Sequence, residues 1–133
     1  MRKHALAIIV TLGLAAACEG GDGDGGSAAI GAPTGATCPD AGTSLTWQDF
    51  GKPFVESYCL RCHSDEVQGT ARQGAPSDHN FDTHFECRAF ATHMDEWAGS
   101  GPDASNTAMP PAEPRPSEEE RRMLSEWLAC GAP

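Results

Sequence analysis

Two cysteines and a histidine occur together in Cys59-Leu60-Arg61-Cys62-His63, and this C-x-x-C-H spacing is the one through which c-type haem is attached to proteins. The two thiols lie about one helical turn apart, so both can add to the vinyl groups on one edge of a porphyrin. The imidazole next to the second thiol can then ligate the iron. The motif therefore predicts one covalently bound haem c, held by Cys59, Cys62 and His63.

Two other kinds of site fit these cysteines less well. A structural zinc site normally needs a second pair of ligands, and the sequence has no second C-x-x-C and no H-x-x-x-H. A thiol redox motif of the thioredoxin type belongs after a strand in an alternating strand and helix pattern, which this sequence lacks. We therefore expect haem at this motif.

The first 17 residues have the three parts of an export signal. Arg2 and Lys3 form a basic start, residues 5–14 form an apolar run, and small residues lead directly to Cys18. Such a signal resembles that of bacterial lipoproteins, in which the cysteine is lipidated and becomes the first residue of the mature chain. We expect removal of residues 1–17 and a lipid anchor on Cys18; cleavage as an ordinary secretory signal is the alternative.

Residues 19–37 are rich in glycine and contain no aromatic residue and one large aliphatic residue, Ile30. A segment of this composition buries too little apolar surface to offset the entropy that ordering costs. We therefore expect residues 18–37 to form a lipidated, flexible tether and residues 38–133 to form the folded domain. One domain is what a chain of 133 residues accommodates.

The mature chain is strongly acidic. Loss of Arg2 and Lys3 lowers the number of basic residues from 9 to 7 against 19 acidic ones, so the formal charge changes from −10 to −12. An acidic surface repels phosphate backbones, which argues against binding of nucleic acid, and it favours encounter with a basic protein surface. We therefore expect partner proteins with a basic docking surface.

Three stretches of the domain show helical periodicity. Residues 46–63 place aromatic side chains at helical spacing, and Pro53 either kinks this helix or marks the start of a new one. Residues 82–97 form the second stretch. Residues 117–131 form the third, which opens with a capping box and ends at a glycine. No stretch alternates with the period of a strand, so the domain is predicted to be all-α.

Three cysteines remain outside the signal and the motif: Cys38, Cys87 and Cys130. Exported proteins meet an oxidising environment, in which disulfides form. A bridge between Cys38 and Cys130 would close a loop around the whole domain, which the chain-entropy description values at about 4 to 5 kcal/mol. This is the expected pairing, with Cys87 as a buried free thiol. A bridge between Cys87 and Cys130 stays open as the alternative.

The order of these elements is similar to that of the class I cytochrome c fold. A helix delivers C-x-x-C-H, a loop and middle helices follow, a second loop carries methionine, and a terminal helix contains an aromatic residue. The resemblance spans about residues 44–131, and the C-terminal residues 127–133 also resemble small exported cytochromes of myxobacteria. It implies three to five helices around one haem.

The resemblance implies a second axial ligand as well. In the family a methionine in a downstream loop, often followed by proline, holds that place, and Met109, followed by Pro110, matches it. A thioether is a soft, neutral ligand that stabilises ferrous iron, so a His/Met pair suits an electron carrier. His93, on the apolar side of the second predicted helix, is the rival ligand.

Further predictions concern residues around the expected haem. In the family a proline carbonyl after the motif accepts the proton of the proximal imidazole, and Pro76 fills that place by resemblance. Arg72 is expected to pair with a haem propionate. His79 and His84 flank a boundary between loop and helix, and both are expected to be solvated.

These expectations combine into a predicted function. The chain is expected to be a His/Met-ligated electron carrier and not an enzyme, lipid-anchored on the periplasmic side of the cell envelope, with redox proteins as partners. The alternative is a haem-based sensor or peroxidase-like protein whose sixth iron site is open or labile. Ligation of the iron by Met109 discriminates between the two.

Overall fold

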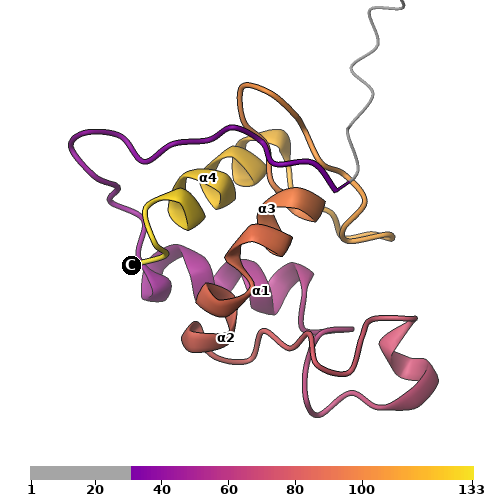
Figure 1. Ribbon diagram of the computed structural model, residues 1–133. Coiled ribbons are helices and arrows are strands. Elements are labelled where there is room, and N and C mark those ends of the chain that lie inside the picture. Colours follow the sequence, from indigo (N-terminus) through magenta and orange to yellow (C-terminus); the bar gives the residue numbers. More distant parts are fainter. Residues whose placement is uncertain (1–30) are drawn as a thin grey trace, which may run out of the picture.

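The computed structural model describes residues 31–133, and this part of the chain is helical, with no strand and one isolated bridge between Ser100 and Ser105. The all-α prediction is confirmed for these residues. The predicted signal, residues 1–17, and the predicted lipidation site, Cys18, lie outside them. In chain order the elements are the π-helical turn η1 (Trp47–Gly51), α1 (Lys52–Tyr58), the 3₁₀ turn η2 (Gly69–Arg72), α2 (His84–Ala89), α3 (Ala91–Ala98) and α4 (Glu118–Ala129) (Figure 1).

The first predicted helix, residues 46–63, consists of two consecutive elements and ends earlier than expected, at Tyr58, before the C-x-x-C-H turn. The hydroxyl of Thr46 caps the start and accepts from the N–H of Asp49 at 3.1 Å. In the π-helical turn that follows, the N–H of Gly51 reaches back to the Thr46 carbonyl at 3.1 Å. α1 then begins at Lys52 with proline in its first turn, where a missing N–H is tolerated. The backbone stays helical at Gly51 (φ −57°, ψ −53°) and at Lys52 (φ −61°, ψ −53°), so the π-helical turn leads directly into α1 at the expected residue.

The predicted helix over residues 82–97 is also two elements. Thr83 and Glu86 form a capping box that starts α2. Phe90 leaves helical geometry, with φ −105° and ψ 18°, and separates α2 from α3. The bend places the Phe90 ring against His79, with the ring centroids 4.5 Å apart. Tertiary packing therefore breaks a pattern that looks continuous in the sequence.

The core lies between α4, α3 and the η1–α1 segment. Trp127 and Leu124 of α4 are fully buried, and Phe54 and Val55 of α1 belong to the same cluster. Gly51 lies beneath the indole: a Cβ on this residue would be 2.6 Å from the Trp127 ring. Only a residue without a side chain allows η1 to approach the indole so closely.

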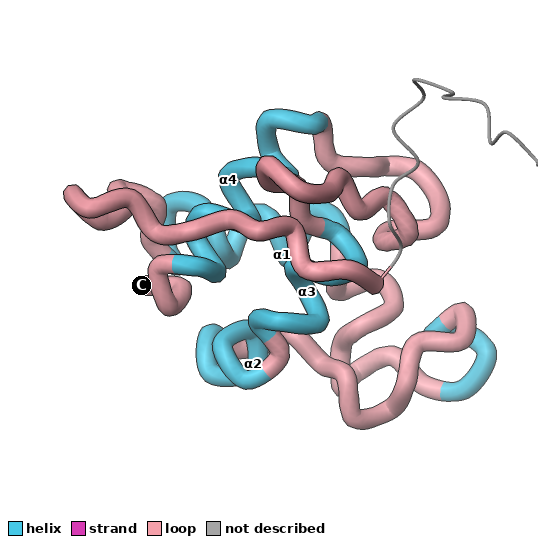
Figure 2. Tube along the Cα trace, turned by 45° about the horizontal axis from the view of Figure 1, so that its top comes forward, coloured by secondary structure: helices cyan, strands magenta, loops and turns pink. Residues whose placement is uncertain are grey.

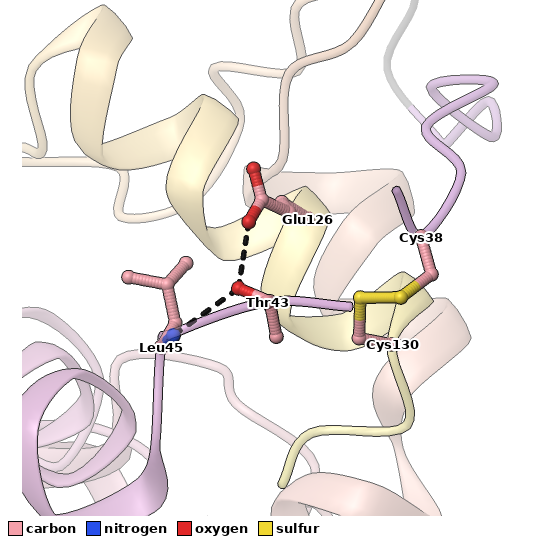
Figure 3. Close-up of a disulfide and its surroundings, with 5 residues drawn as sticks. All are labelled: Cys38, Thr43, Leu45, Glu126 and Cys130. Atoms are coloured by element: carbon pink, nitrogen blue, oxygen red, sulfur yellow. Dashed lines mark hydrogen bonds between the residues drawn. A yellow bond between two sulfur atoms is a disulfide. The ribbon is translucent and has the colours of Figure 1, made fainter. Parts of the chain in front are cut away.

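The C-terminus closes the domain against its N-terminal part. Cys130 forms a disulfide with Cys38, which is the expected pairing (Figure 3). Cys87 is a buried free thiol. Near the disulfide, the hydroxyl of Thr43 donates to the carboxylate of Glu126 on α4 at 2.6 Å (Figure 3). These contacts hold the segment before η1 on α4.

The packed part of the chain begins before residue 38. Thr34 is fully buried, and its hydroxyl donates to the carboxylate of Asp95 on α3 at 2.9 Å. The N–H of Asp103 donates to the Thr34 carbonyl at 2.9 Å. Residues 31–37 therefore run along the domain as part of it (Figures 1 and 2), and the expected boundary at Cys38 omits them. Composition misses this segment because hydrogen bonds, rather than apolar burial, hold it.

α4 begins with the predicted capping box, and its first acidic residue holds the preceding loop. The carboxylate of Glu118 accepts hydrogen bonds from the hydroxyls of Ser100 at 2.5 Å and Ser105 at 2.9 Å. These hydrogen bonds lower the pKa of Glu118 below its ordinary value. The loop that leads from α3 towards Met109 is thereby tied to α4.

Replacement of Gly51 by alanine should destabilise the fold, although alanine is the better helix former. The added methyl group would overlap the buried Trp127 ring. We expect the free energy of unfolding to fall by about 1 to 3 kcal/mol in urea denaturation. Gln48→Ala, at an exposed position of the same turn, is the control and should change stability by less than about 0.5 kcal/mol. An unchanged midpoint for Gly51→Ala would show that the indole does not restrict this turn.

Glu118→Gln should lower the free energy of unfolding only at pH values at which the carboxyl group of Glu118 is ionised. A carboxyl group whose pKa is lowered by folding adds stability above its unfolded pKa, about 4.3 for glutamate, and that stability is lost as pH falls through the folded pKa. The deficit of the variant in unfolding free energy should therefore be largest near about pH 6 and shrink below about pH 4. Glu119→Gln is the matched control, because Glu119 is exposed in the same turn and pairs with Arg122. Equal pH profiles of the two variants would contradict this role of Glu118.

Candidate functional site

One cavity of about 520 Å³ lies between the end of α1 and the loop that precedes α4. The predicted cofactor residues all line it: Cys59, Cys62, His63, Arg72, Pro76 and Met109. Its volume falls in the range of about 300 to 1,000 Å³ that is usual for ligand and cofactor sites. Residues from three separate segments of the chain thus face one space.

The C-x-x-C-H motif forms a tight turn at the end of α1. The N–H groups of Cys62 and His63 both donate to the Cys59 carbonyl, at 3.1 and 2.9 Å. Both thiols are free; Cys62 is buried and Cys59 is half-buried. Burial raises the pKa of the Cys59 thiol to about 12, so this thiol is protonated at neutral pH. The turn therefore presents two S–H groups and one imidazole to the same cavity.

His63 is held as a neutral imidazole with a fixed tautomer. Its Nδ1 lies 2.8 Å from the carbonyl oxygen of His79, and because a carbonyl only accepts, Nδ1 carries the proton. Burial lowers the pKa of His63, and the hydrogen bond to His79 opposes this shift. The Phe81 ring packs against the imidazole, with the centroids 4.9 Å apart. The lone pair of Nε2 is thus available for a metal ion.

Pro76 and Arg72 differ from the expectations for them. The carbonyl that accepts from His63 is that of His79, whereas the Pro76 carbonyl accepts from the Arg72 guanidinium at 2.6 Å. Arg72 is only 5% exposed, and all three of its nitrogens donate to protein oxygens. The acceptors are the carbonyls of Ser64, Val67, Ala75, Pro76 and His79 and the side-chain oxygen of Asn80. These hydrogen bonds occupy the guanidinium that was expected to pair with a propionate.

Arg72 instead organises the loop that aligns His63. Its Nη2 lies 3.3 Å from the His79 carbonyl oxygen, the same atom that accepts from the imidazole of His63. The loop has few apolar side chains, so its main-chain carbonyls converge on one buried cation that satisfies several of them at once. A charged side chain thereby fixes the acceptor of the imidazole proton.

Met109 reaches the cavity from the loop between α3 and α4. Its N–H donates to the carbonyl of Trp97 at 2.9 Å, and its own carbonyl accepts from Arg121 at 2.9 Å. The other candidate methionines lie on helices: Met94 of α3 is buried at the cavity wall, and Met123 of α4 packs on the core. Hydrogen bonds therefore hold the main chain of Met109 at both its N–H and its carbonyl. The position of the sulfur then depends only on the torsion angles of the side chain.

Arg61, inside the motif, connects the C-x-x-C-H turn to the loop that carries Met109. Its guanidinium donates to the carbonyls of Ala112 and Glu113, shortly after Met109. Nothing in the sequence indicates this role of Arg61, because its acceptors are main-chain carbonyls, which every residue possesses. The turn and the loop are thus held together by a residue of the motif itself.

The rest of the cavity wall is mostly apolar, and no carboxylate among residues 31–133 lines it. The apolar lining consists of Phe54, Ala75, Phe81, Met94, Trp97, Ala98, Pro110, Pro111, Pro116 and Leu124. Such a wall suits a large, flat, apolar ring and limits the access of water. Two free thiols, a neutral imidazole and a thioether are the groups that attachment and axial ligation of a c-type haem require. The residues present therefore fit the group that the motif implies.

His79 and His93 form a histidine pair at the cavity that the sequence does not reveal. Nε2 of His79 lies 3.2 Å from Nδ1 of His93, and the rings are nearly parallel with their centroids 5.3 Å apart. Since the centroids are much farther apart than the nitrogens, the rings meet edge to edge through an N–H···N hydrogen bond. The carboxylate of Asp78 contacts Nδ1 of His79 at 3.0 Å, and the imidazole of His84 lies 2.6 Å from the Ala132 carbonyl. His79 and His84 are half-buried, unlike the solvated residues expected.

Replacement of Arg72 by glutamine should loosen the loop that aligns His63. Glutamine is shorter and has two N–H donors, so most of the carbonyls around Arg72 lose their partner. We expect the free energy of unfolding to fall by about 2 to 4 kcal/mol in urea denaturation. Arg88→Gln, at an exposed position of α2, is the control and should shift stability by less than about 0.5 kcal/mol. Equal stability of the two variants would refute the organising role of Arg72.

Comparison with known proteins gives no relative for this chain: no protein family, curated protein or solved structure matches it. Within residues 31–133, no helix is both long enough and apolar enough to cross a membrane. In the same part of the chain, no group of three or more His, Cys, Asp and Glu side chains converges in a way that could hold a metal ion. A function for the chain therefore rests on the geometry of its cavity.

Proposed function

We propose that this chain is a mono-haem c-type cytochrome of the class I fold that carries electrons, with His63 and Met109 as the axial ligands of the iron. The observation that carries the proposal is the shared cavity. The C-x-x-C-H turn and Met109 come from separate segments and line one largely apolar space of about 520 Å³. Core packing alone gives no reason to place two free thiols, a neutral imidazole and a loop methionine around such a space.

Cys59 and Cys62 hold the cofactor in this proposal. Each S–H group would add across one vinyl group, with the sulfur bonded to one vinyl carbon and the hydrogen to the other, so no oxidant would be needed. Both cysteines are free thiols in this structure, the state that the addition requires. Bound haem supplies a one-electron couple between ferric and ferrous iron.

The chain's own residues tune that couple. The carbonyl of His79 orients the His63 imidazole and makes it a stronger electron donor. The thioether of Met109 is a neutral, soft ligand, which favours the ferrous state and raises the reduction potential. The apolar wall limits solvent access, and solvent access is a further determinant of the potential.

The N-terminal sequence supports a place in the cell envelope. Residues 1–17 would direct export, and lipidation of Cys18 would anchor the mature chain on the periplasmic side of a membrane. A formal charge of −12 after removal of the signal favours redox partners with a basic docking surface and disfavours nucleic acid. The lipid anchor would keep the carrier close to redox partners at the membrane.

Met109→Ala in the full chain, produced in a bacterium that attaches c-type haem, tests the proposal. The unmodified protein should retain haem after denaturation, because the bonds are covalent, and should be low-spin in both oxidation states. The variant should lose its sixth ligand, and its reduction potential should fall by roughly a tenth of a volt or more, within the range of about 0.8 V that axial ligands control. Met123→Ala is the matched control, because Met123 is a half-buried methionine outside the cavity lining, and it should keep spin state and potential.

Three other outcomes would overturn the proposal in whole or in part. If the haem stays low-spin in Met109→Ala, another residue is the sixth ligand of the iron, and His93, which lines the cavity, is the first candidate. Haem that is high-spin in the unmodified protein would favour the sensor or peroxidase-like function. A protein that is exported without haem would end the cytochrome assignment.

A further inference from the structure

Arg121 of α4 is a buried cation that none of the roles above requires. It is only 3% exposed. Its Nη1 lies within hydrogen-bonding distance of the carbonyls of Ala98 at 2.8 Å, Asn106 at 2.7 Å and Met109 at 2.9 Å, so its two N–H groups are shared among three acceptors. Its own carbonyl accepts from the N–H of Ser100 at 3.2 Å. One residue thus contacts the path from the end of α3 to Met109 at four points.

These contacts tie Met109 to the C-terminal end of α3 on both sides of its Cα. The N–H of Met109 donates to the carbonyl of Trp97, in the last turn of α3. The carbonyl of Met109 accepts from Arg121, and the same guanidinium nitrogen donates to the carbonyl of Ala98, which ends α3. The main chain of Met109 is therefore held relative to α3 through α4.

Packing alone gives no reason for an arginine at this position. A buried guanidinium loses its hydration, and an apolar side chain of similar volume would fill the same space without that cost. The acceptors of Nη1 are main-chain carbonyls, and one of them, that of Ala98, lies at the C-terminal end of a helix, where the helix dipole favours a cation. The advantage of arginine lies in joining carbonyls that no apolar residue could hold.

The loop has a buried polar side chain as well as its buried prolines, Pro110 and Pro116. Asn106 is fully buried. Its Nδ2 donates to the carbonyls of Asp95 and Ala32, at 2.9 and 2.8 Å. Hydrogen bonds to the main chain, with Arg121 as the charged member, therefore order the path to Met109.

We propose that Arg121 is the positioning residue for Met109: it holds the loop so that the thioether stays at the iron and external ligands do not replace it. This inference rests on the proposed function, because it takes Met109 as the axial ligand. It gives a role at the site to a residue of α4 that lies outside both the C-x-x-C-H motif and the loop that carries Met109.

Arg121→Gln in the haem-loaded full chain tests the inference, with Arg122→Gln as the matched control. Arg122 is the next residue of α4, is exposed and pairs with Glu119, so its replacement removes the same charge without touching the loop. The readouts are hydrogen exchange at the Met109 amide and the rate at which added imidazole binds to the ferric protein. Both rates should rise about tenfold or more in Arg121→Gln and stay within about twofold in Arg122→Gln.

Two further variants keep the test decisive. Arg121→Met fills a similar volume without donors, so it should fold and still release Met109, and it replaces Arg121→Gln if glutamine prevents folding. In Arg121→Lys one ammonium keeps the charge and carries three N–H donors, so it should restore part of the slow exchange, because all three carbonyls contact a single nitrogen of Arg121.

Unchanged rates in Arg121→Gln and Arg121→Met would overturn the inference. An equal acceleration of exchange at amides throughout α4 would overturn it too, because that result would indicate general loosening of the fold. The outcome is separate from that of the proposed function. If Met109→Ala shows that the thioether is not an iron ligand, the cytochrome proposal loses its sixth ligand, whereas exchange at the Met109 amide still reports whether Arg121 holds the loop.

Discussion

Main-chain carbonyls that converge on buried arginines hold the loops on which the cavity depends. Arg72 gathers carbonyls of the loop after the C-x-x-C-H turn, and Arg121 gathers those on the path to Met109. Neither loop forms regular secondary structure around these carbonyls, and buried carbonyls left without a donor would be costly. A guanidinium presents several donors in a fixed geometry, so one side chain can satisfy carbonyls from distant turns. The placement of both proposed iron ligands follows from this chemistry.

The small core explains why such hydrogen bonds are needed. The apolar cluster gathers around Trp127, and α4, the longest helix of the described residues, has only 12 residues. The disulfide between Cys38 and Cys130 ties the segment before η1 to the end of α4. The cavity lies directly beside this core, because Phe54, Met94 and Leu124 belong both to the cluster and to the cavity wall. In the proposed holoprotein the haem ring would pack against these side chains, which would couple cofactor binding to folding.

Contacts between residues that are close together in the sequence could be predicted from it. The capping boxes, the start of α1 at Lys52 and the end of α4 before Gly131 depend on residues three or four positions apart, so side-chain types and spacing suffice to locate them. The motif residues and the loop methionine were also identified as one site, and they line one cavity. Their ligation of iron stays a prediction, because it depends on the cofactor.

What the sequence by itself determined was therefore the helical class, both ends of α4 and the chemical groups of the site. Only the tertiary structure decided that the carbonyl of His79, and not that of Pro76, accepts from His63, and that Arg72 binds the loop. It also decided that residues 31–37 pack on the domain. Each of these outcomes depends on the direction in which main-chain carbonyls and N–H groups point. Every residue carries a carbonyl, so only the folded path of the chain determines which one a distant donor meets.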